Sequence, residues 1–147
     1  MKNVLMGVAL ILAMMGLGCG TSRSNADAIN GNWSAALSNS SSGNPTLNFT
    51  TTLKSTGSTG VTVTNLTFNS SNACFSGGDN ATGAFTLTGT TSGVTSGGFQ
   101  LTVDSQPAAN TLTLTGTLKN NTITGAWTLT GITSGCAGSG NFTMNKS

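Results

Sequence analysis

The sequence predicts an all-β protein whose eight antiparallel strands form an up-and-down meander that closes into a small barrel. From residue 29 onwards, apolar side chains recur at every second position with threonine, serine or asparagine between them, which is the period of a half-buried strand. Turns rich in glycine, asparagine and serine separate these short segments, and no amphipathic helical pattern follows residue 28. Closure is favoured over the alternative, a β-sandwich, because a closed barrel has no exposed strand edges.

The first four strands are expected where the alternation begins. Their inward-facing residues are Trp33, Ala35 and Leu37, then Leu47, Phe49 and Leu53, then Val61, Val63, Leu66 and Phe68, then Phe85 and Leu87. The step from Val63 to Leu66 breaks the two-residue period. We therefore expect a β-bulge near Thr64 or Asn65, since one extra residue restores the facing.

The last four strands continue the same pattern. Their inward-facing residues are Phe99, Leu101 and Val103, then Leu112, Leu114 and Leu118, then Ile123, Trp127 and Leu129, then Phe142 and Met144. A two-residue hairpin turn is predicted at Asn120–Asn121, because asparagine tolerates the positive φ angles that such turns require. Leu118 then faces Ile123, and a slip of one residue would turn the whole apolar set towards solvent.

Two short Gly-x-Trp motifs lie in strands of the predicted barrel. Gly31-Asn32-Trp33 opens the first strand, and Gly125-Ala126-Trp127 lies in the seventh. The domain resembles the avidin and lipocalin superfamily of eight-stranded barrels, in which the first strand opens with Gly-x-Trp. The resemblance implies the fold. Those families bind small ligands in the barrel mouth, but their binding residues have no counterparts in this chain, so ligand binding is not carried over.

The first eighteen residues have the layout of a signal peptide. Lys2 supplies a positive start, the run from Val4 to Leu17 is apolar apart from glycines, and Gly18-Cys19 follows. This order of charge, apolar run and small residue is typical of a cleavable export signal. The apolar run is shorter than the about 20 residues that a membrane-spanning helix needs, so we expect residues 1–18 to be removed.

The residues before Cys19 resemble the lipobox of bacterial lipoproteins, in which a small residue precedes a cysteine that is acylated and becomes the mature N-terminus. Gly18 fits, whereas Gly16 and Leu17 depart from the commonest order. The resemblance implies a palmitate-type acyl chain on Cys19, with membrane lipid as the partner. The resemblance also implies an exported protein that is anchored to the cell envelope, and the absence of an aspartate after Cys19 is compatible with sorting to the outer membrane, as in some bacterial lipoproteins. The alternative is an ordinary secretory peptide whose Cys19 is unmodified.

The rest of the chain divides into two parts. Residues 19–28 have no periodic apolar pattern and are expected to be the lipidated N-terminus and a flexible tether. Residues 29–147 are expected to be a single barrel domain. Of three cysteines, acylation of Cys19 leaves Cys74 and Cys136, which we expect to form a disulfide in an oxidising compartment. In a meander their two connections lie at the same end.

The residue types leave few candidates for catalysis or for metal binding. The chain has no histidine or tyrosine, and its three acidic residues are all aspartates, so general acid or base catalysis has few candidates. Asp79 and Asp104 are interpreted as turn residues. We therefore predict a non-enzymatic protein with no cofactor and no metal site. A net charge of +2 without a basic cluster gives no support for nucleic-acid binding.

Two functions remain. The first is a structural or scaffolding lipoprotein at the membrane surface, and the alternative is a lipoprotein that binds a small apolar ligand or a glycan. In the first case side chains fill the barrel. In the second, Trp33, Trp127 and Phe85 line an apolar pocket. The glycines that would leave this pocket open are Gly83, Gly116 and Gly125.

Overall fold

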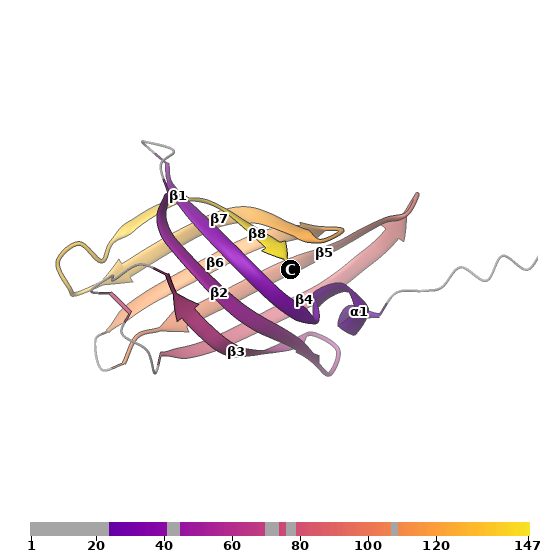
Figure 1. The fold of residues 1–147 in the computed structure, drawn as a ribbon, viewed down its shortest axis with the longest axis horizontal. Coiled ribbons are helices and arrows are strands. Elements are labelled where there is room, and N and C mark those ends of the chain that lie inside the picture. Colours follow the sequence, from indigo (N-terminus) through magenta and orange to yellow (C-terminus); the bar gives the residue numbers. More distant parts are fainter. Residues whose placement is uncertain (1–23, 41–44, 70–73, 76–78, 107–108) are drawn as a thin grey trace, which may run out of the picture.

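The computed structural model describes residues 24–40, 45–69, 74, 75, 79–106 and 109–147, and it is a closed barrel (Figure 1). Each strand pairs antiparallel with the next one, and β8 pairs with β1. The elements are α1 (Asn25–Ile29), β1 (Gly31–Asn39), β2 (Pro45–Thr56), β3 (Gly60–Phe68), β4 (Asn80–Thr91), β5 (Val94–Asp104), β6 (Asn110–Lys119), β7 (Thr122–Gly131) and β8 (Gly138–Lys146). The predicted eight-stranded meander and its closure are confirmed.

The hairpin between β6 and β7 has the predicted register. Leu118 pairs with Ile123, and Leu114 pairs with Trp127. Asn120 adopts a left-handed φ of 56° in the turn, a conformation that asparagine enters at lower cost than most residues. The register therefore turns leucine, isoleucine and tryptophan side chains together towards the interior.

The predicted bulge lies in β3. Thr50 pairs with Thr67 and Thr52 pairs with Thr64, so the single residue Thr51 is opposite two residues of β3. Asn65, one of those two, has a φ of 52°. Because β3 carries one residue more than its partner there, the apolar side chains on either side of the bulge face the same way.

The interior is filled by the apolar side chains that the alternation predicts. The largest of those with less than 2% of their surface exposed are Trp33, Phe49, Phe85, Phe99, Ile29, Leu37, Leu53, Leu101, Leu112, Leu114, Leu118 and Ile123. Thr51 also faces inward, and its hydroxyl donates to the carbonyl oxygen of Thr64 at 2.9 Å. A bonded hydroxyl avoids the cost of an unpaired polar group in an apolar interior.

The folded domain begins earlier than predicted. Residues 25–28 were expected to belong to a flexible tether, but they form most of α1, in which Ala28 and Ile29 are buried. The expectation was wrong because Ser24 and Asp27 form a capping box, with the Ser24 hydroxyl accepting from the Asp27 amide at 3.2 Å. Such a box stabilises the start of a helix too short for a periodic signal.

The barrel has two different ends (Figure 1). One carries α1 and the β2–β3, β4–β5 and β6–β7 turns, and we call it the capped end. Asn25 holds α1 there, because its amide donates to the carbonyl oxygen of Ser58 and accepts from the amide of Leu87. The opposite end carries the β1–β2, β3–β4, β5–β6 and β7–β8 connections. We call it the disulfide end.

Candidate functional site

A disulfide joins Cys74 to Cys136 and defines one end of the barrel. The two Cα atoms are 5.5 Å apart, and the residues are 62 apart in sequence. The bond ties the β3–β4 connection to the β7–β8 connection, so the predicted pairing is confirmed.

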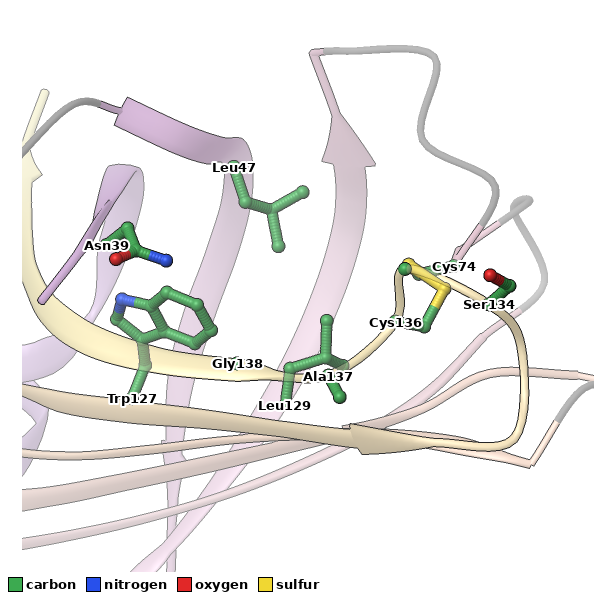
Figure 2. Close-up of a pocket in the computed structure, with 10 residues that line it drawn as sticks. Asn39, Leu47, Cys74, Trp127, Leu129, Ser134, Cys136, Ala137 and Gly138 are labelled. Carbon is green, nitrogen blue, oxygen red and sulfur yellow. A yellow bond between two sulfur atoms is a disulfide. The ribbon is translucent and has the colours of Figure 1, made fainter. Parts of the chain in front are cut away.

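An apolar pocket of about 370 Å³ opens beside this disulfide. Leu47 of β2 lies across the pocket from Trp127 and Leu129 of β7 (Figure 2). Asn39 and Ser134 add an amide and a hydroxyl to the lining. The lining combines apolar walls with a few polar groups, as small-molecule sites usually do.

Trp127 forms one wall of the pocket and is fixed in place. Its indole N–H donates to the carbonyl oxygen of Ser38 at 3.0 Å, which satisfies the only donor of the ring. Gly138 lies beside the ring, and a Cβ atom at that position would be 3.3 Å from its edge. A side chain at Gly138 would therefore press on the indole. The absence of a side chain at Gly138 therefore allows Trp127 to keep its present position in the pocket wall.

Asn110 holds the rim of the pocket together and was missed in the sequence. Its side-chain amide donates to the carbonyl oxygen of Cys74 at 3.0 Å and to the hydroxyl of Thr133 at 3.2 Å. Its side-chain oxygen accepts from the amide of Thr133 at 3.4 Å. One side chain thus links three connections. The signal was present, because Asn110 has the inward parity of Leu112 and Leu114 and a polar residue there needs partners.

The structure does not bring Trp33 and Phe85 to the pocket. Trp33 lies near the capped end, where its indole N–H donates to the carbonyl oxygen of Ile29 at 2.8 Å. Phe85 is 1% exposed within the core, and neither residue lines the pocket beside the disulfide. Of the three residues predicted to line one pocket, only Trp127 does so.

The glycines predicted to open that pocket do not open it, because neighbouring atoms occupy the space. A Cβ atom on Gly125 would be 2.1 Å from the carbonyl oxygen of Thr115, and one on Gly116 would be 2.8 Å from the ring of Phe142. A Cβ atom on Gly83 would meet Val61 at 3.1 Å. These glycines therefore permit close packing of strands and side chains.

The two acidic residues of the disulfide end form hydrogen bonds with the β5–β6 connection and the start of β6. The carboxylate of Asp104 accepts from the hydroxyl of Thr111 at 2.7 Å, and that of Asp79 accepts from the amide of Gln106 at 3.4 Å. Within the described ranges, no three residues of the types His, Cys, Asp and Glu are grouped so that they could hold a metal ion.

The described residues thus form a closed eight-stranded up-and-down β-barrel with a short helix at one end and a pocket beside a disulfide at the other. The chain matches no protein-family model, no curated protein and no solved structure. The predicted signal peptide and Cys19 lie outside the described residues. Within those residues, no helix combines the length and the apolar character needed to cross a bilayer.

Proposed function

We propose that this chain is an exported lipoprotein, which acyl chains on Cys19 anchor to the cell envelope, and that its barrel has a structural or scaffolding role at the membrane surface. The observation that carries the proposal is the position of Cys19. It follows a charged start and an apolar run that together have the layout of an export signal. It also precedes Ser24, the cap residue of α1, by only five positions.

The proposed role is non-enzymatic. The chain has no histidine, and the carboxylates of Asp79 and Asp104 accept hydrogen bonds from the β5–β6 region rather than facing a shared cleft. The core side chains are almost all apolar. Catalysis near neutral pH needs a positioned acid, base or nucleophile, and a packed apolar interior suits a stable supporting body better.

Cell fractionation of a Cys19→Ala variant tests the anchor. We expect the unaltered chain to sediment with outer membranes. The variant should leave the membrane fraction, because it has no thiol to acylate. The matched control is the double variant Cys74→Ser with Cys136→Ser, which keeps Cys19 and should remain in the membrane fraction. Membrane association that survives the loss of Cys19 would contradict the proposal.

A second candidate function is the binding of a small apolar ligand at the disulfide end. It is favoured by one observation, the pocket of about 370 Å³ walled by Leu47, Trp127 and Leu129. Ligand pockets usually have volumes of about 300–1,000 Å³. This function is compatible with the anchor, since the pocket and α1 lie at opposite ends.

Tryptophan fluorescence with an apolar naphthalene dye tests this candidate. We expect the dye to change the emission of a Trp33→Phe variant, in which Trp127 remains, and to leave that of a Trp127→Phe variant almost unchanged. An equal response of both variants, or none in either, would contradict binding at this pocket. A response to oligosaccharide instead of dye would favour the glycan alternative.

A further inference from the structure

Positive charge gathers at the capped end of the barrel. Lys54 lies two residues before the end of β2, Lys119 ends β6, and Lys146 ends β8. The turns that follow β2 and β6 belong to the same end as α1. Lys54 and Lys119 are exposed, so their ammonium groups face solvent. Within the described residues, these three are all the lysines and arginines of the barrel, although they come from three strands far apart in sequence.

Negative charge gathers at the opposite end. Asp79 directly precedes β4, and Asp104 ends β5. Both positions belong to the disulfide end. The remaining acidic side chain of the described residues is Asp27 in α1 at the capped end, where three lysines outnumber it, and its oxygen Oδ2 accepts from the amide and the hydroxyl of Ser24. The barrel therefore carries opposite net charge at its two ends, although the whole chain has a net charge of only +2.

The chain enters the barrel at the positive end. Ser24 caps α1, and Asn25 fastens α1 to Ser58 and Leu87. The side chain of Lys146 also donates to the carbonyl oxygens of Asp27 and Ala28, at 3.4 and 3.3 Å. These contacts fix α1 to the barrel, so the described chain begins at this end.

The segment before α1 is short. Five peptide steps separate Cys19 from Ser24, and a fully extended chain of that length spans at most about 17 Å. An acyl anchor on Cys19 therefore holds the capped end within about 17 Å of the lipid headgroups. Lysines that come within about one Debye length of the headgroups, roughly 8 Å at physiological salt, are attracted to anionic lipids.

We propose that the capped end rests against an anionic lipid surface, with the lysine side chains towards the headgroups and the disulfide-end pocket facing away from the membrane. This orientation rests on the proposed anchor at Cys19. Three independent features agree on it: the exit of the chain, the position of the lysines, and the carboxylates at the far end, which an anionic surface repels. The pocket of Figure 2 then stays open to molecules in the adjoining space.

The two tryptophans of the chain allow a direct test, because one lies near each end. Trp33 pairs with Lys146 on β8, and Trp127 pairs with Gly140 on the same strand. Those two partners are six residue steps apart along β8, which corresponds to about 20 Å. Energy transfer to an acceptor in the membrane falls steeply with distance, so the two indoles report different heights above the lipid.

The experiment uses the acylated chain purified from membranes, as single-tryptophan variants Trp33→Phe and Trp127→Phe. Each is reconstituted in vesicles of phosphatidylglycerol and phosphatidylcholine with a dansyl-labelled headgroup, and flotation is measured in the same samples. We expect Trp33 to lose most of its emission to dansyl and Trp127 to lose a much smaller part. Equal loss, or greater loss from Trp127, in chains that float with the vesicles would overturn the orientation and leave the anchor standing. Chains that do not float would overturn both proposals.

A charge variant tests the contribution of the lysines. Lys54→Gln with Lys119→Gln removes two positive charges without touching the contacts of Lys146, and we expect it to shrink the difference between Trp33 and Trp127 on anionic vesicles. The conservative control, Lys54→Arg with Lys119→Arg, should keep that difference. Salt at 1 M should shrink it for the unaltered lysines, since the Debye length falls to about 3 Å. A difference unchanged by the glutamine variant would overturn the electrostatic part of the proposal.

Discussion

At the scale of single residues, two glycines in neighbouring strands show how closely the wall is packed. Gly125 is opposite Gly116 in the β6–β7 pair, and a Cβ atom on it would be 2.1 Å from a backbone oxygen of Thr115. Gly98 of β5 is exposed, and a Cβ atom on it would have no neighbour within 4 Å. The same chemical change should therefore have opposite consequences at the two positions.

We predict that Gly125→Ala lowers the free energy of unfolding by about 3 kcal/mol, because backbone atoms must move to admit the methyl group. The matched change Gly98→Ala should alter it by no more than about 0.5 kcal/mol. Urea denaturation of both variants measures the two values. Similar losses of unfolding free energy in the two variants would show that the close packing around Gly125 does not require a glycine.

Asn110 supports a second prediction at this scale. In Asn110→Ala, the carbonyl oxygen of Cys74 and the amide of Thr133 lose partners in a partly buried region, and the loss of a partner costs about 1–3 kcal/mol where the group is buried. We predict a loss of about 3 kcal/mol in unfolding free energy. Asn141→Ala, at an exposed position of β8, is the control and should be close to neutral. A neutral Asn110→Ala would mean that the rim does not depend on this amide.

Residue by residue, the two-residue period predicted which side chains face inward, since burial follows from parity alone. It did not predict which inward-facing polar residues, such as Asn110, hold other parts of the chain by hydrogen bonds. The partners of the Asn110 side chain are the carbonyl oxygen of Cys74, 36 residues away, and the amide and hydroxyl of Thr133, 23 residues away. Such contacts depend on how the connections meet in space, and no local pattern encodes them.

At the scale of elements, the disulfide is the strongest constraint on the end that carries the pocket. A cross-link over 62 residues contributes about 4 kcal/mol in the chain-entropy model, because it restricts the unfolded chain. We predict that Cys74→Ser with Cys136→Ser lowers the unfolding free energy by about that amount. The variant should also respond less to the apolar dye, since Cys74 and Cys136 both line the pocket.

Denaturation of the oxidised and the reduced unaltered chain gives the control for this prediction. The reduced chain should match the double serine variant in stability. A double variant as stable as the oxidised chain would show that the bond is incidental to the fold. A destabilised variant with full dye response would show that the pocket does not depend on it.

The strands could be predicted from sequence and α1 could not, for a physical reason. A strand of nine or more residues repeats its alternation several times, whereas α1 has five residues and less than two helical turns. Its stability comes from the capping box, from Asn25 and Ile29, which contact the barrel, and from Lys146 of β8, which donates to carbonyl oxygens of α1. Those contacts exist only after the strands have brought the turns of the capped end together.

At the scale of the whole molecule, closure followed from the sequence because eight strands in a meander leave two edges to satisfy, and β1 and β8 satisfy each other. The separation of charge could not be predicted in the same way. It depends on which end each strand terminus reaches, so it becomes visible only with the topology. The same holds for the candidate pocket, whose walls come from strands far apart in sequence.

We propose that acyl chains on Cys19 hold this barrel at a membrane, and the mass of the mature N-terminal peptide is the decisive measurement. Protein extracted from membranes should begin at Cys19, and that residue should carry a diacylglyceryl thioether and an amide-linked acyl chain. A mature chain that begins elsewhere, or a Cys19 with a free thiol, would contradict the claim.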